Sequence, residues 1–471
     1  MKNIWKSAIL FLFVAALLSA CETSTTPNEP TPISTMKWTW ISGRNTVNQL
    51  PSYGTRGTAA ASNVPGAREH AVSWTDLGGK LWLFGGYGFD SAGYMGHFND
   101  LWKFDPATSQ WTWVSGGNTM DQAGVYGTKG VSAPSNVPGA RMGAVSWIDA
   151  EGNFWLFGGR GYPEVGDFGS LNDLWRFDQA TLEWTWISGS NSGNQPGAYG
   201  TLGTADPANV PGGRTGAVSW IDAEGNFWLF GGNGYDSAGS KGWLNDLWKL
   251  DQATLEWTWV SGGNTGGQAG TYGTKGTADA ANVPGGRYKA LSWIDASGRL
   301  WLFGGNGLDS DAALSDLNDL WKFDPTTLQW TWISGSDTGD LKGTYSTLGT
   351  ASTSNYPGGR YAAIAWIDSS GDLWLFGGYG LDSAGSRGWL NDLWRFHPAT
   401  AAWAWESGSG SVGQKGAYGT QGTGDLSNVP GARYFSVSWI DAQGKLWLFG
   451  GYGSDSASDG GWLNDLWHAT K

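Results

Sequence analysis

A repeat of fixed length constrains the fold of this chain more than any other feature. The segment Asn-Asp-Leu-Trp occurs six times, and each copy begins 73 residues after the one before it. The six copies begin at Asn99, Asn172, Asn245, Asn318, Asn391 and Asn464. A second segment, Phe-Gly-Gly, keeps the same spacing, beginning at Phe84, Phe157, Phe230, Phe303, Phe376 and Phe449. A period without insertions or deletions indicates one structural unit repeated six times in a single body.

Each unit has the signature of four short β-strands. In the second unit the strand-like runs are 141–147, 154–157, 172–177 and 184–187, bounded by Gly, Asp and Pro. The run 81–84 is apolar on both of its alternating faces, so its sheet must be covered on both sides. Small sheets stacked face to face around an axis satisfy this pattern. The sequence therefore predicts an all-β propeller with one blade per repeat.

The order of motifs resembles a known repeat family. An Arg-led strand, a strand ending in Phe-Gly-Gly, then Asn-Asp-Leu-Trp and a Trp-led strand resemble the kelch repeat across residues 38–467. Kelch repeats run near 50 residues, and the extra length here lies before each Arg-led strand. The resemblance implies a six-bladed kelch-type β-propeller with four antiparallel strands per blade.

The two ends of the chain predict how the ring closes. The chain begins the repeat region on a Trp-led strand at Trp38 and stops just after a third strand at Trp467. An incomplete last blade would leave an open strand edge. We therefore expect the N-terminal strand, residues 38–43, to complete the last blade.

The first 20 residues have the composition of a targeting signal. Lys2 and Lys6 precede the apolar run 7–18, and Leu-Ser-Ala leads into Cys21. This pattern resembles a bacterial lipobox, which implies that Cys21 becomes lipidated. A plain secretory signal, or a membrane anchor with an incidental cysteine, are the alternatives.

Residues 21–36 carry Thr, Pro, Ser and Glu without periodicity, which predicts a disordered tether behind the lipidated cysteine. The propeller then occupies 37–471. This arrangement predicts a protein anchored by lipid in the bacterial cell envelope, at the outer membrane or the cell surface.

Charge and cysteine content exclude several classes of function. The net charge is −13, and an acidic surface repels phosphate backbones, so nucleic acid is not expected as a partner. Cys21 is the only cysteine, which excludes disulfides, thiolate metal sites and a cysteine nucleophile. The Tyr–Cys crosslink of galactose oxidase, a kelch-type copper enzyme, is therefore excluded. We expect no cofactor and a monomer.

Loop length indicates which face of the propeller binds. The connections from the fourth strand of one unit to the first of the next span about 24 residues, for example 44–67. Loops of that length are usually functional. The second-to-third connections lie on the same face, so recognition is expected on this long-loop face. Repeated Tyr-Gly-Thr and Asn-Val-Pro-Gly segments indicate that the long loops fold back over the blades.

Six arginines are the first candidate ligand-binding residues. They begin the Arg-led strands at Arg68, Arg141, Arg214, Arg287, Arg360 and Arg433. A cationic ring at the mouth of the channel would bind a carboxylate or another anion. The alternative is a structural ion pair with the aspartate of Asn-Asp-Leu-Trp. Those aspartates are Asp100, Asp173, Asp246, Asp319, Asp392 and Asp465.

Three tryptophans are the second set of candidates. Of the 34 tryptophans, 30 fill five positions in every repeat and are expected in the blade core. Trp243, Trp389 and Trp462 instead share a position two residues before Asn-Asp-Leu-Trp. This position suits an aromatic platform for a sugar or a partner, or an anchor packed on the neighbouring blade.

A calcium site has weaker support. Five repeats continue into Gly-Gly-x-Gly-x-Asp, which matches the start of a calcium-binding nonapeptide. The aspartates are Asp90, Asp236, Asp309, Asp382 and Asp455. Calcium needs six or more oxygen ligands, and each loop supplies a single aspartate. No metal site is therefore expected.

Near-identical blades favour binding over catalysis, because an active site needs different groups in different blades. We expect non-enzymatic recognition of a glycan or protein on the long-loop face. One alternative is a periplasmic or surface carbohydrate-active enzyme that resembles the kelch sialic acid mutarotases. Another is a purely structural envelope protein.

Overall fold

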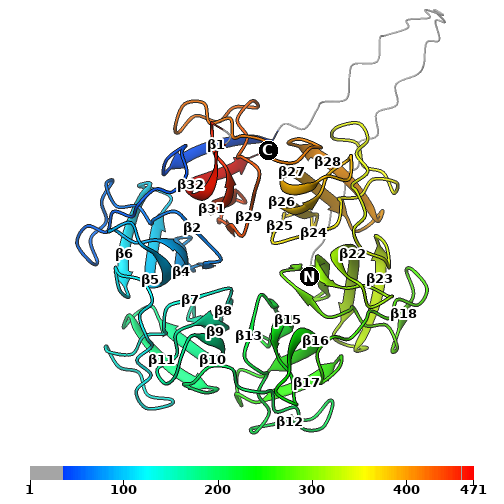
Figure 1. The fold of residues 1–471 in the computed structure, drawn as a ribbon, viewed down its shortest axis with the longest axis horizontal. Coiled ribbons are helices and arrows are strands. Elements are labelled where there is room, and N and C mark those ends of the chain that lie inside the picture. The colour runs from blue at the N-terminus through cyan, green and yellow to red at the C-terminus, as the bar shows by residue number, and fades with distance from the viewer. Residues whose placement is uncertain (1–35, 458, 471) are drawn as a thin grey trace, which may run out of the picture. The chain divides into compact units, whose positions relative to one another are not determined.

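The computed structural model describes residues 36–457 and 459–470, which form a six-bladed β-propeller (Figure 1). All regular elements in these residues are strands, and they include no helix able to cross a membrane. The predicted all-β, six-bladed architecture is confirmed. The expected signal segment, Cys21 and the tether up to residue 35 lie outside the described residues.

Each blade has four antiparallel layers, and the innermost layer is in two pieces. In blade 1, β2 (Arg68–Glu69) and β3 (Val72–Thr75) both pair with β4 (Leu81–Phe89). The next strands outward are β5 (Met95–Asp105) and β6 (Gln110–Ser115). The short β3–β4 and β5–β6 turns lie on one face, and the longer connections lie on the other.

The other blades repeat this order. Blade 2 comprises β7 (Arg141–Met142), β8 (Val145–Ile148), β9 (Phe154–Gly161), β10 (Gly169–Asp178) and β11 (Glu183–Ser188). Blade 3 comprises β13 (Arg214–Thr215), β14 (Val218–Ile221), β15 (Phe227–Tyr235), β16 (Lys241–Leu250) and β17 (Trp257–Ser261). Blade 4 comprises β19 (Arg287–Tyr288), β20 (Leu291–Ile294), β21 (Leu300–Leu308), β22 (Leu314–Asp324) and β23 (Gln329–Ser334). Blade 5 comprises β24 (Arg360–Tyr361), β25 (Ile364–Ile367), β26 (Leu373–Leu381), β27 (Arg387–His397) and β28 (Ala402–Ser407). Blade 6 comprises β29 (Arg433–Tyr434), β30 (Val437–Ile440), β31 (Leu446–Ser454), β32 (Gly460–Thr470) and β1 (Lys37–Ser42). Two short pieces of the long loops, β12 (Ala205–Asp206) and β18 (Ala278–Asp279), add to the outer edges of blades 3 and 4.

The ring is closed by the N-terminal strand, as the sequence predicts. β1 pairs antiparallel with β32, from Lys37 opposite Thr470 to Trp40 opposite Trp467. Figure 1 shows the blue β1 beside the red β32 in one blade. Trp38 is fully buried in the core shared with blade 5, so both ends of the chain are fastened in the last blade.

The innermost strand is interrupted, whereas the sequence predicted one continuous strand over 141–147. The residue two after each arginine has a positive φ and turns its peptide toward the axis. Its N–H donates to the C=O of the same position in the preceding blade, over 2.7 to 3.0 Å. The six positions are His70, Gly143, Gly216, Lys289, Ala362 and Phe435. They form a closed ring of hydrogen bonds, called here the axial ring, that ties all six blades together.

The core lies between the blades, which explains why both faces of each sheet are apolar. Trp74, Trp82 and Phe84 of blade 1 pack against Phe154 and Trp175 of blade 2. The same contact recurs at the other blade interfaces. Burial of each large side chain contributes about 1.5–3 kcal/mol.

The Gly-Gly pair bends each second strand around this contact. Gly85 and Gly86 have φ of 66° and 98°, and the β4–β5 register shifts there. A Cβ at Gly85 would lie 2.8 Å from the carbonyl oxygen of Arg141 in the next blade. Glycine is required here by both the backbone conformation and the space.

Candidate functional site

The six predicted arginines are buried in ion pairs. Arg68 donates from Nη1 and Nη2 to both carboxylate oxygens of Asp100, over 2.7 and 2.8 Å. Its Nε and Nη1 also donate to the carbonyls of Gly66 and Gly85. The other five blades repeat the pair, and each arginine side chain is at most 1% exposed. The structure therefore shows the paired alternative, and these guanidinium groups offer no donor to a ligand from solvent.

Each Arg–Asp pair also fixes a long loop. The hydroxyl of Tyr53 and the indole N–H of Trp102 both donate to Asp100 Oδ2, over 2.9 and 2.7 Å. Tyr126, Tyr199, Tyr272, Tyr345 and Tyr418 make the same contact in the other blades. The long loops are therefore folded back onto the blades, as expected from their sequence.

The five aspartates considered for calcium have structural partners. Asp236 Oδ1 accepts the N–H groups of Ala238 and Ser240, and its Oδ2 accepts the N–H of Gly266 in the next long loop. Asp309, Asp382 and Asp455 repeat these contacts, and Asp90 caps its own turn. Among the residues that the structure describes, no group of three His, Cys, Asp or Glu side chains could hold a metal.

The blades differ from one another around the axis on the long-loop face. Three strand positions vary there, close to the Arg, Gly-Gly and Asn-Asp-Leu-Trp residues that repeat in every blade. The position after each arginine holds Glu69, Met142, Thr215, Tyr288, Tyr361 or Tyr434. The position after each Gly-Gly holds Tyr87, Arg160, Asn233, Asn306, Tyr379 or Tyr452. The position of the predicted tryptophans holds His97, Ser170, Trp243, Asp316, Trp389 or Trp462.

These three positions lie directly across from one another in each blade. In blade 3, Thr215 pairs with Asn233, and Asn233 pairs with Trp243. The eighteen side chains surround the axis above the axial ring, and we call this region the axial funnel. Near-identical frames thus carry five different sets of groups at one place, since blades 5 and 6 both have Tyr, Tyr and Trp.

The funnel contains a cavity of about 480 Å³ between blades 2 and 5. Its wall includes Arg160, Lys241, Trp243, Tyr288 and Tyr361. A volume of this size is within the range of small-molecule sites. The cavity is off-centre because aromatic side chains fill the other half of the funnel.

Two cations without acidic partners lie on the cavity wall. Neither Arg160 nor Lys241 forms an ion pair with any described residue. Partial burial and the nearby charge of Arg160 lower the pKa of Lys241. Two cations that repel each other beside a cavity are stabilised by a bound anion, although the chain as a whole is acidic.

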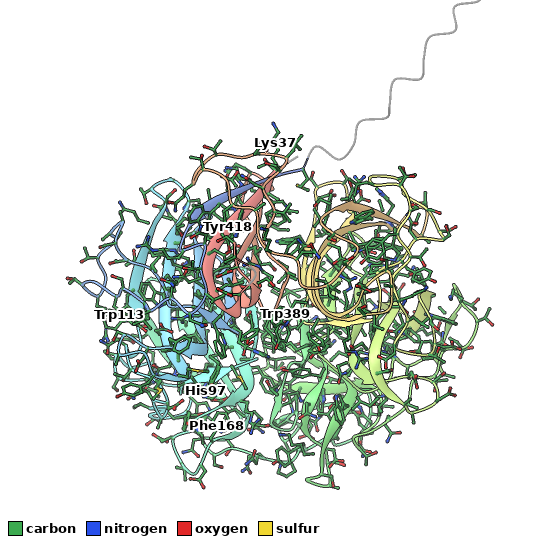
Figure 2. The ribbon with its side chains drawn as sticks, turned by 45° about the horizontal axis from the view of Figure 1, so that its top comes forward. Lys37, His97, Trp113, Phe168, Trp389 and Tyr418 are labelled. Carbon is green, nitrogen blue, oxygen red and sulfur yellow. The ribbon has the colours of Figure 1, made fainter. Side chains whose placement is uncertain are left out.

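The aromatic half of the funnel separates the three predicted tryptophans. Trp389 lies toward the centre of the ring in Figure 2, and its ring contacts Tyr452 edge-on in blade 6. Trp462 packs against Tyr87 of blade 1 and Tyr452 of its own blade. These two tryptophans are packed as anchors on neighbouring aromatic rings, while Trp243 faces the cavity as a platform would.

Ionisable side chains lie at the base of the funnel. Burial raises the pKa of Glu69 to about 7, while the Trp462 side chain and the Lys289 charge oppose the rise. Burial lowers the pKa of Lys289 to about 8, against the attraction of Glu69. Burial, with the charges of Lys289 and His97, lowers the pKa of His70 well below its usual value. His70 Nε2 lies 3.0 Å from the hydroxyl of Tyr288, which belongs to blade 4 on the opposite side of the axis.

The raised pKa of Glu69 predicts a pH-dependent stability. A carboxyl group whose pKa rises on folding favours the folded state below its unfolded pKa, and this contribution is lost as the pH rises through about 7. We compare the free energy of unfolding of the Glu69→Gln variant with that of the unmodified protein. As the pH rises from 5 to 8.5, this difference should shift in favour of the variant, by roughly 3 kcal/mol at most. Urea unfolding at the two pH values measures this difference. A difference that does not change with pH would contradict the buried, titrating carboxyl group.

Several charged or titratable groups face Glu69, and their titration could also contribute to the pH dependence. They are His70 beside it, Lys289 and Tyr288 of blade 4, Tyr361 of blade 5, and Tyr434 of blade 6. The tyrosines stay neutral over this range because burial raises their pKa values. The change between pH 5 and 8.5 is thus assigned to Glu69 and, at its upper end, Lys289.

Two other cavities lie away from the funnel. One of about 460 Å³ lies among the outer loops of blades 4 and 5, beside Trp332 and Trp403. Another of about 450 Å³ opens the channel on the short-turn face, beside Ser73, Trp74 and Thr75 with their repeats. The first is lined by outer-loop and outer-strand residues and the second by residues next to the short turns, so neither belongs to the funnel.

Comparison with known proteins finds relatives over part of the chain. No family model matches the chain. N-acetylneuraminate epimerase 2 of Escherichia coli O6:H1 is 29% identical, over 36% of this chain and 50% of that protein. The N-acetylneuraminate epimerases of Shigella flexneri and Escherichia coli K12 are also 29% identical, with the same coverage. The chain spans about half the length of the curated relatives it matches.

The funnel residues other than the three tryptophans were missed by the sequence prediction. That prediction weighed the residues that repeat, and repeated residues build the frame. The available signal was variation directly after two motifs that do not change, the strand-leading arginine and the Gly-Gly pair.

Proposed function

We propose that the protein binds an acidic sugar in the axial funnel. The observation that carries this proposal is that three strand positions which differ among the blades line one cavity, beside two cations without acidic partners. Arg160 follows a Gly-Gly pair, and Thr215 and Tyr288 each follow a strand-leading arginine. Other blades have different residues at these positions, so the repeated frame does not require these three side chains. Selection for a ligand accounts for different groups at that one place.

The charges and rings of the cavity support an anionic sugar. Arg160 and Lys241 supply donors for a carboxylate, and neither is neutralised within the protein. Trp243, Tyr288 and Tyr361 supply faces for the apolar side of a sugar ring. The relatives named for N-acetylneuraminate, which carries a carboxylate on a sugar ring, support the same class of ligand.

A second function, interconversion of the anomers of the bound sugar, is favoured by the base of the funnel. Glu69, His70, Tyr288 and Lys289 are ionisable groups in a partly buried site, and burial shifts their pKa values. Such shifted groups are typical of acid–base catalysis. The relatives are named as epimerases, in agreement with this class of reaction.

The location of the protein is part of the proposal. β1 begins at Lys37, opposite Thr470, at the end of the blade that carries the short turns. The funnel lies at the other end, beside Trp462. A lipid on Cys21 would therefore hold the short-turn face nearer to the membrane and leave the funnel accessible.

Isothermal titration with N-acetylneuraminate and with its methyl ester tests the proposed function. We expect the acid to bind at least tenfold more tightly than the ester. A charge-assisted contact contributes about 1.5–3 kcal/mol, so Arg160→Met and Lys241→Met should each lose tenfold or more. Lys342→Met, at an exposed lysine on a long loop, is the matched control and should bind normally. Equal affinity for acid and ester, or unchanged binding in both cavity variants, would contradict the proposal.

A further inference from the structure

The base of the funnel contains a chain of three side chains that spans the axis. Tyr288 lines the cavity, and its hydroxyl lies 3.0 Å from Nε2 of His70. The other ring nitrogen of His70, Nδ1, lies 3.8 Å from Oε2 of Glu69. The order starting from the cavity is phenol, imidazole and carboxylate. Tyr288 belongs to blade 4, and His70 and Glu69 belong to blade 1 on the opposite side of the axis.

His70 is held in this order by its surroundings. Its backbone belongs to the axial ring, with a φ of 57°. Its imidazole stacks on the ring of Phe435 with 3.3 Å between the centroids, and only 7% of the residue is exposed. Blades 2 and 3 carry Gly143 and Gly216 at the same position, so the ring does not require a histidine.

Two atoms of this chain are left without partners. Glu69 Oε2 and His70 Nδ1 are both buried, and neither has a hydrogen-bond partner among the described residues. Leaving buried polar atoms unsatisfied costs about 1–3 kcal/mol each. Two such atoms facing each other, 3.8 Å apart, require an explanation, and a catalytic role is one.

We propose that Tyr288, His70 and Glu69 form a proton relay that opens the ring of the bound sugar, with Tyr288 as the group that touches the substrate. The relay rests on the proposed function, since it acts on the sugar in the same cavity. His70 and Glu69 are positioning residues that act through Tyr288. His70 accepts the Tyr288 hydroxyl at Nε2 and carries its own proton at Nδ1, toward the Glu69 carboxylate.

The step balances without a redox partner. The hydroxyl on the anomeric carbon gives its proton to the Tyr288 oxygen, and the Tyr288 proton passes to His70 Nε2. The O–H electron pair forms a carbonyl, the ring C–O bond breaks, and the ring oxygen takes a proton from water. Closure on the other face of the carbonyl reverses each transfer and returns the proton from His70 through Tyr288. The water that protonated the ring oxygen is left as hydroxide, and on closure it takes the proton that the attacking hydroxyl releases.

Exchange spectroscopy on the two anomers of N-acetylneuraminate, with and without the full-length protein, tests the relay. We expect the protein to accelerate exchange, and Tyr288→Phe to lower that acceleration at least tenfold while calorimetric binding stays within threefold. His70→Gly, which copies the residue of blades 2 and 3, should lose a similar factor while the protein remains folded. Added imidazole should restore exchange in His70→Gly, which a structural role would not predict. Tyr94→Phe, at an exposed tyrosine, is the control and should match the unmodified protein.

The outcomes separate the relay from the proposed function. If the protein binds the sugar but does not accelerate exchange, or if Tyr288→Phe exchanges normally, the relay is overturned and the binding proposal stands. If imidazole does not rescue a folded His70→Gly variant, the role of His70 is overturned. If the protein does not bind the sugar, both proposals fail.

Discussion

Deletion of residues 37–43 is expected to prevent the ring from closing. The deletion removes β1, whose Trp38 is 1% exposed and contacts Trp366 and Phe376 of blade 5. Trp40 is lost from the same core and Ile41 from the core between blades 6 and 1, and β32 becomes an open edge. The lost burial amounts to roughly 5–10 kcal/mol, which is comparable with the whole stability of many proteins.

We expect this shortened protein to unfold at a much lower temperature and to associate through the free edge of β32. Calorimetry and light scattering measure the two effects. Removal of residues 22–33, which lie before the propeller, is the matched control and should leave both unchanged. A shortened protein that stays monomeric with an unchanged melting temperature would show that β1 does not fasten the ring.

Replacement of one buried aspartate is expected to have the second largest effect. Asp319 accepts hydrogen bonds from Nη1 and Nη2 of Arg287, from the Tyr272 hydroxyl and from the Trp321 indole. Asp319→Asn leaves the arginine charge buried without a counter-charge and turns an amide donor toward other donors. Loss of one partner of a buried ion pair costs about 3–5 kcal/mol.

The exposed pair of Arg299 and Asp324 is the control for this prediction. Its atoms are 3.6 Å apart and its side chains are 40% and 32% exposed, so Arg299→Met should cost less than about 1 kcal/mol. Urea unfolding of the two variants gives the comparison. Equal losses would show that burial does not set the strength of the Arg287–Asp319 pair.

The frame of the propeller could be predicted from the sequence because it repeats. The Phe-Gly-Gly and Asn-Asp-Leu-Trp segments mark two strands of every blade, and Trp38 and Trp467 indicate the closing contact. The strands follow from local sequence patterns, and the closing contact follows from the number of strands in the repeats. The axial ring could not be predicted, because its φ angles occur at His70, Lys289 and other residues that do not favour them.

The candidate site could be predicted only in part. Arg287 and Asp319 are 32 residues apart in the sequence. This spacing alone is compatible with an arginine free to bind a ligand and with an arginine in a structural ion pair. Trp243 lines the cavity while Trp389 and Trp462 pack against tyrosines, although all three share one repeat position. Their roles depend on the residues of the adjoining blade, which a repeat pattern does not specify.

A crystal structure of the protein with N-acetylneuraminate tests the central claim most directly. We predict the sugar in the axial funnel, with its carboxylate between Arg160 and Lys241 and its anomeric hydroxyl at Tyr288. A sugar bound among the outer loops, on the short-turn face, or nowhere at saturating concentration would contradict the claim that the axial funnel is the ligand site.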